Sequence, residues 1–137
     1  MLYAVDSMLI RVGKILRMLG FDTYIRGDES FFKFLEKSLG RVVLTKRKNF
    51  PYLTSTRILS FEDSRDDESI VAFVLKFFQK PNDDLFLSRC LECNTEIILL
   101  SEQFNLHKCP TCNRIYWEGS HVARMKDLRD RILTKSR

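Results

Sequence analysis

Four cysteines near the end of the sequence are grouped as two close pairs. The pairs are Cys90 with Cys93 and Cys109 with Cys112, in the spacing Cys-x2-Cys-x15-Cys-x2-Cys. Each pair can bend around a metal ion through a tight turn. Two such turns around the same ion supply the four ligands of tetrahedral zinc. Strand-like segments lie between the pairs at 97–100 and after them at 114–117. The pattern therefore predicts a small zinc ribbon, with two disulfides as the alternative.

A zinc ion bound by four thiolates has no open coordination position. We therefore predict that this zinc stabilises structure and takes no part in chemistry. Neither His107 nor His121 is then required as a ligand. His121 precedes a basic segment, where it either lies in the first turn of a helix or contacts nucleic acid. Tyr116 and Trp117 are expected to pack within the ribbon, and stacking on bases is the alternative.

The composition is typical of a folded, water-soluble protein, with 45% apolar and 30% charged residues. The longest apolar runs are a few residues, far below the roughly 20 needed to cross a bilayer. The N-terminus has no signal-peptide pattern, so we expect a cytoplasmic protein with reduced thiols and no membrane association.

Residues 1–84 alternate between strand-like apolar runs and apolar residues at helical spacing. Strands are predicted at 2–5, 21–25, 42–44 and 57–61, and helices at 8–19, 30–39 and around 70–78. This alternation predicts an α/β domain with a parallel sheet flanked by helices. A hinge at 81–84 separates it from a second unit, 85–137, which contains the zinc ribbon and a basic C-terminal helix. Phe31 and Phe77 are expected in the core.

Acidic residues follow three of the predicted strands. Asp6 closes the first strand, Asp28 and Glu29 follow the second, and Glu62 and Asp63 follow the fourth. The carboxyl ends of parallel strands meet at one edge of a sheet, where ligands bind. Carboxylates gathered there can hold Mg²⁺ or Mn²⁺ and so activate water for attack on a phosphodiester. For Asp28 the alternative is a helix cap.

The third predicted strand ends in cations instead of acids. Thr45 is followed by Lys46 and Arg47, which suit phosphate oxygens. Basic residues also predominate from Arg124 onward. The net charge of +5 permits a polyanionic partner without requiring one. A solvated terminal helix is the alternative for the basic C-terminal segment.

Five segments together resemble the Mut-seven C-terminal family of PIN-like ribonuclease domains. They are 6–9, 16–23, 41–45, 88–94 and 115–121. The resemblance spans nearly the whole chain and implies a PIN-type α/β fold with a fused zinc ribbon and metal-dependent RNase activity. It also implies that Asp6 is the first acid of the site, Asp28 the second, and Asp22 a further motif residue.

The sequence departs from that family after the third strand. Family members commonly have a basic residue and an aspartate after the threonine, whereas Thr45 is followed by Lys46 and Arg47. A cation there repels a divalent metal and removes one ligand, so a later acid such as Asp63 compensates or catalysis is lost.

The resulting hypothesis is a ribonuclease with Asp6, Asp28 and Asp63 as catalytic acids, the first two being ligands of Mg²⁺ or Mn²⁺. RNA is the expected partner. The residues predicted to contact it are Arg11, Arg17, Lys46, Arg47, His121 and Arg124. The alternatives are a catalytically degenerate RNA-binding module of the same fold, or a module that docks on a protein partner through the ribbon.

Overall fold

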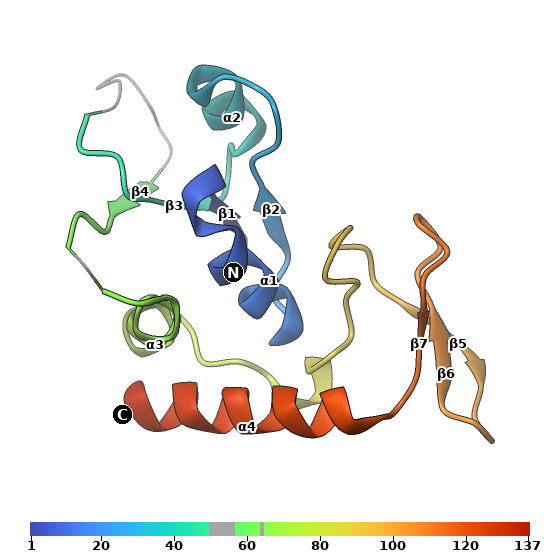
Figure 1. Ribbon diagram of the computed structural model, residues 1–137. Coiled ribbons are helices and arrows are strands. Elements are labelled where there is room, and N and C mark those ends of the chain that lie inside the picture. The colour runs from blue at the N-terminus through green and yellow to red at the C-terminus, as the bar shows by residue number, and fades with distance from the viewer. Residues whose placement is uncertain (50–56, 64) are drawn as a thin grey trace.

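The computed structural model describes residues 1–49, 57–63 and 65–137. A parallel sheet with its helices comes first, followed by a small antiparallel sheet and a long C-terminal helix (Figure 1). The first elements are β1 (Tyr3–Val5), a 3-10 turn (Ser7–Leu9), α1 (Ile10–Met18), β2 (Thr23–Ile25), α2 (Phe31–Lys37), β3 (Val42–Thr45), β4 (Arg57–Ser60) and α3 (Asp67–Phe77). The others are a 3-10 turn (Asp83–Leu85), β5 (Ile98–Ser101), β6 (Leu106–Lys108), β7 (Ile115–Tyr116) and α4 (Ser120–Lys135).

The larger sheet has the strand order β2-β1-β3-β4, and every neighbouring pair is parallel. Val5 at the end of β1 is in register with Ile25 of β2 and Leu44 of β3. The residues that follow these strands therefore emerge together at one edge of the sheet. This arrangement, with the ribbon after it, confirms the predicted α/β class with a parallel sheet flanked by helices.

The helices begin and end at residues with an identifiable local reason. Ser30 caps α2 by accepting a hydrogen bond from the Lys33 N–H at 3.1 Å, so Asp28 is not the cap of this helix. Gly20 follows α1 with φ of +100°, a left-handed conformation that glycine adopts without strain. A Cβ at Gly20 would also lie 2.5 Å from the Leu85 carbonyl oxygen. Glycine is thus needed there for both the turn and the close approach.

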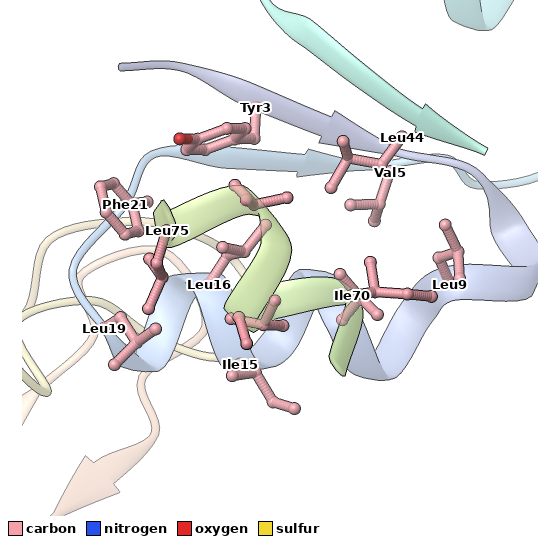
Figure 2. Packing of buried hydrophobic residues seen from close by; sticks show 14 of the residues in the cluster. Tyr3, Val5, Leu9, Ile15, Leu16, Leu19, Phe21, Leu44, Ile70 and Leu75 are labelled. Carbon is pink, nitrogen blue, oxygen red and sulfur yellow. The ribbon is translucent and has the colours of Figure 1, made fainter. Parts of the chain in front are cut away.

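The core lies on both faces of the parallel sheet. On one face, side chains of β1 and β3 such as Tyr3, Val5 and Leu44 pack against α1 and α3 (Figure 2). On the other face, Ala4 and Val43 pack against α2. Alternate residues of one strand thus pack into opposite layers. Burying each large apolar side chain contributes about 1.5–3 kcal/mol to the stability of the fold.

Two aromatic residues predicted to lie in the core differ in the structure. Phe31 is buried, with 7% of its surface exposed, as predicted. Phe77 is 61% exposed, so its prediction was wrong. It is the last residue of α3 and contacts Phe73, with 4.6 Å between ring centroids.

Helix α4 runs from the ribbon back to α3 (Figure 1). Its Ile132 is fully buried in the same core cluster as the residues of α1 and α3. Arg131 and Lys135 pair with Glu68 of α3 at 3.2 and 3.5 Å. The guanidinium of Arg129 lies 4.6 Å from the centre of the Phe86 ring, directly after the second 3-10 turn. Three of the C-terminal basic residues therefore hold the helix in place.

The first pair of ribbon cysteines is fastened to the amino end of β2. Arg17 of α1 is only 5% exposed, and its guanidinium donates to the carbonyl oxygens of Thr23 at 2.9 Å and Leu91 at 2.8 Å. The Asn94 side chain donates to Asp22 at 2.7 Å and accepts from the Thr23 N–H at 2.9 Å. These bonds join the ribbon to the edge of the sheet opposite Asp6.

Asp22 is held between the two units. Arg41, which precedes β3, pairs with its carboxylate at 2.8 Å. Partial burial raises the pKa of Asp22, but the donors on Asn94 and Arg41 lower it by more, so the net shift is downward. The motif residue implied by the family resemblance is thus a joint between strand ends and the ribbon.

We expect replacement of Arg17 by Met to leave two buried carbonyl oxygens without a donor and to lower the free energy of unfolding by about 2–4 kcal/mol. Arg11→Met on the same helix is the control, because Arg11 makes an exposed ion pair with Asp67 at 3.5 Å. That loss should be below about 1 kcal/mol. Urea unfolding in zinc-containing buffer measures both, and equal losses would contradict this role of Arg17.

Candidate functional site

The sulfur atoms of the four cysteines all lie within 4.8 Å of one another. Cys90 and Cys109 are fully buried, and Cys112 is exposed. The Cys90 and Cys112 sulfurs are 3.7 Å apart, close to the roughly 3.8 Å edge of a tetrahedron with Zn–S bonds of about 2.3 Å. The residues therefore fit the predicted zinc ion. Within residues 1–49, 57–63 and 65–137, this is the only group of three or more potential metal ligands.

The two cysteine turns have the same backbone geometry. The Asn94 N–H donates to the Cys90 carbonyl at 2.9 Å, and the Asn113 N–H donates to the Cys109 carbonyl at 2.8 Å. Both asparagines have positive φ, 68° and 64°. Asparagine tolerates this conformation better than most residues, so an Asn one position after each cysteine pair is a sequence signal for these turns.

The ionisation of the thiols also suits a divalent cation. Burial opposes ionisation of Cys109, but the N–H groups of Cys112 and Thr111 outweigh it and lower its pKa to about 7. Burial and the neighbouring sulfurs raise the pKa of Cys93 to about 12. The Cys109 thiolate therefore forms readily while Cys93 resists ionisation, and a bound zinc ion would supply the positive charge that favours both thiolates.

At the other edge of the sheet, Asp6 is fully buried and both of its carboxylate oxygens accept hydrogen bonds. Oδ1 accepts from the Ser7 N–H and from the Arg26 guanidinium, each at 2.8 Å. Oδ2 accepts from the Thr45 hydroxyl at 2.6 Å. Asp6, Arg26 and Thr45 come from the carboxyl ends of β1, β2 and β3, so the predicted convergence of strand ends is present.

The other two predicted catalytic acids lie elsewhere on the surface. Asp28 is exposed in the loop between β2 and α2, and Asp63 is exposed and pairs with Arg65 at 3.0 Å. The carboxylate of Glu29, the residue after Asp28, accepts a hydrogen bond from the Tyr24 hydroxyl at 2.5 Å. In the described part of the chain, no three acids lie close enough to share an ion. The roles of Asp6, Asp28 and Asp63 in an Mg²⁺ or Mn²⁺ site stay predictions.

Arg26 contacts Asp6, and two further cations follow the adjacent strand β3. Besides Arg26, the adjacent residues Lys46 and Arg47 extend from the end of β3. Arg47 is exposed, its guanidinium lies 4.2 Å from the centre of the Phe31 ring, and its backbone N–H donates to Thr45 at 3.1 Å. Sequence reasoning missed Arg26, although its position directly after β2 matches that of Asp6 after β1.

The remaining residues predicted to contact RNA lie in three different places. Arg11 pairs with Asp67 on the outer surface of α1. Arg17 is buried in the joint with the ribbon, has no surface to offer a phosphate, and is not retained as an RNA ligand. His121 and Arg124 lie in the first turns of α4, next to the ribbon.

A family model, the Mut7-C RNAse domain, matches residues 1–129. The chain belongs to this family. The match covers the parallel sheet, the ribbon and most of α4, so a single family model includes both units of this Mut7-C protein. No curated protein and no solved structure matches the chain. The PIN type of the fold therefore stays a prediction.

The family assignment supports ribonuclease-type chemistry and RNA as the partner of this Mut7-C protein. None of its helices within the described residues is long and apolar enough to span a membrane.

We expect the purified Mut7-C protein to contain one zinc ion per chain. Cys90→Ser should lower both the zinc content and the midpoint of thermal unfolding, because zinc binding contributes directly to folding. His107→Ala is the control and should keep one zinc per chain. Metal analysis by mass spectrometry together with thermal unfolding measures both effects. A loss of zinc in the His107 variant would contradict a four-cysteine site.

We also expect the Arg26–Asp6 pair to contribute to stability in a pH-dependent way. Burial raises the pKa of Asp6, but hydrogen bonds from Thr45, Arg26 and Ser7 lower it by more, so the net shift is below the ordinary value for an aspartate. A carboxyl whose pKa is lower in the folded state stabilises the fold above its unfolded pKa and loses that contribution as pH falls through the folded value.

The difference in unfolding free energy between wild type and Arg26→Gln should therefore be constant above about pH 5 and shrink below about pH 4. Urea unfolding between pH 2 and pH 7 measures it. Arg65→Gln, which breaks the exposed pair with Asp63, is the control and should show a small difference throughout. A constant difference for Arg26→Gln down to pH 2 would contradict the pairing.

Proposed function

We propose that this Mut7-C family member is a ribonuclease that binds RNA across the carboxyl edge of its parallel sheet and cleaves a phosphodiester beside Asp6. The observation that supports this most directly is a buried carboxylate, Asp6, bonded by Arg26 and Thr45 at the ends of adjacent strands, with Lys46 and Arg47 directly following Thr45. The cations at this edge suit a polyanionic substrate, and the single acid suits a cleavage reaction that requires a carboxylate.

The cations at this edge have a role in substrate binding. The exposed guanidinium of Arg47 and the ammonium of Lys46 can donate to phosphate oxygens and fix the position of the RNA backbone. Thr45 holds one oxygen of Asp6 and so orients the carboxylate toward the edge. Arg26 is also anchored by the Glu29 carbonyl oxygen at 3.0 Å, which limits its movement.

Mg²⁺ or Mn²⁺ is the cofactor implied by the family resemblance, and when bound it would activate water and balance charge on the phosphate. Asp6 and Asp28 are its predicted ligands. Because the Arg26 guanidinium occupies Oδ1 of Asp6 at 2.8 Å, a metal must compete with an existing cation. We therefore propose that any metal binding at this edge is weak without RNA.

A second candidate function is favoured by the same ion pair. With Oδ1 of Asp6 bound by Arg26, and with Lys46 and Arg47 following the third strand, the edge suits RNA binding without cleavage. The protein would then be a catalytically degenerate member of the family. Docking on a protein partner through the ribbon stays a prediction.

We expect Asp6→Asn to reduce cleavage of labelled single-stranded and structured RNAs with Mn²⁺ by about 100-fold or more. Asp83→Asn, in an exposed acid of the 3-10 turn, is the control and should cleave like wild type. Circular dichroism and thermal unfolding of each variant separate loss of activity from loss of folding.

Two outcomes would change the proposal. Equal cleavage by wild type and a folded Asp6→Asn variant would remove Asp6 from the mechanism. If no variant cleaves RNA but all bind it with an affinity that falls steeply as salt rises, the degenerate RNA-binding function is favoured.

A further inference from the structure

A hollow of about 470 Å³ lies between the ribbon, the linker after the 3-10 turn and the first half of α4. Its volume is within the usual range for small-molecule sites, roughly 300–1,000 Å³. Four residues of α4 line it, at positions 121, 122, 125 and 126, which share one face of the helix. The hollow is separate from the carboxyl edge at which Asp6 lies.

The inner lining of the hollow is apolar. Phe86, Leu91 and Met125 line it, and each also packs against the main core. Its position is therefore set by residues fixed in the fold. Leu91 lies between two zinc ligands, and its carbonyl oxygen accepts from the buried Arg17.

Aromatic rings at the ribbon end give the hollow a flat, exposed surface. Trp117 is 54% exposed instead of packed within the ribbon, and its ring meets His121 edge to face, with 6.2 Å between centroids. A Cβ at Gly119 would lie 3.2 Å from the His121 Nδ1 atom and 3.7 Å from the Trp117 Nε1 atom. The missing side chain at Gly119 thus lets both rings approach each other.

Zinc binding helps to position this aromatic wall. The Tyr116 hydroxyl lies 2.9 Å from the Cys90 sulfur, and Tyr116 also lines the hollow. The residue before Trp117 is therefore tied to a metal ligand.

The polar groups of the hollow carry mixed charge. Lys126 and Arg89 are balanced by Asp84 and Glu118, and neutral groups such as Asn105 lie among them. A bare phosphate would gain little net attraction from two cations and two acids. A flat, neutral ligand with both donors and acceptors on its edge matches the lining better, and a nucleobase has this chemistry.

We propose that this hollow binds one unpaired nucleobase of a single-stranded RNA, which stacks on Trp117. The proposal rests on the proposed function for RNA as the partner, and it adds a second contact remote from the cleavage site. The ribbon is fastened at the amino edge of the sheet, and α1 spans the distance from there to Asp6, about 14 Å. An RNA that occupies both places must therefore span more than a single nucleotide.

Trp117 is the only tryptophan in the sequence, so its fluorescence reports this site alone. In buffer without Mg²⁺ or Mn²⁺, a single-stranded 12-nucleotide RNA should quench its emission. The same sequence as a fully paired duplex should not, because its bases are already stacked. Equal quenching by the duplex, or no quenching by the single strand, would overturn the proposal.

Binding of the same labelled RNA, measured by fluorescence anisotropy, gives a second test. Trp117→Ala should weaken binding by about tenfold, and Trp117→Phe should restore most of the affinity. Phe104→Ala is the matched control, since Phe104 is a 67% exposed aromatic of the ribbon outside the hollow. Equal affinities for Trp117→Ala and Phe104→Ala would overturn the proposal.

This result is independent of the cleavage experiment. If Trp117→Ala binds like wild type while Asp6-dependent cleavage occurs, only the nucleobase site is wrong. If Trp117 contributes to binding but no variant cleaves RNA, only the ribonuclease function fails.

Discussion

The buried guanidinium of Arg17 determines how the two units of this protein sit relative to each other. It donates to a carbonyl oxygen of β2 and to one in the first cysteine turn, so it joins the sheet to the ribbon inside the protein. Asn94 and Asp22 add polar bonds at the same edge. With this joint in place the ribbon has one orientation, α4 starts from a fixed point, and its Ile132 reaches the core.

The opposite edge of the sheet depends on a different constraint, the parallel register of β1, β2 and β3. That register brings Asp6, Arg26 and Thr45 into one cluster in which a single carboxylate is bonded by a cation and a hydroxyl. The two edges thus separate the two kinds of chemistry. The four clustered cysteines, which can hold a metal such as zinc, lie at one edge, and Asp6 with its bonded Arg26 lies at the other.

Much of this architecture could be predicted from residue patterns, because helices and buried strands have distinct periods of apolar residues. The strands and helices of residues 1–84 follow from these periods, and the cluster of four cysteines follows from the spacing of the two pairs. The prediction was wrong for Phe77. At the end of a helix, the period of apolar residues locates the buried face only approximately. Strand β6 was not predicted, since it is short and its central residue is a half-buried histidine.

The sequence established the local elements, the family and the metal-binding cysteines, because these depend on spacing along the chain. It left open which charges meet across the sheet. Arg26, rather than another carboxylate, is the partner of Asp6, and Arg17 lies in a buried joint instead of on an RNA-binding surface. Likewise, only the packing of α4 against the ribbon makes the hollow beside Trp117. The two pairings, Arg26 with Asp6 and Arg17 with Leu91, join residues 20 and 74 positions apart, and such pairings arise from tertiary packing, which one-dimensional periodicity does not encode.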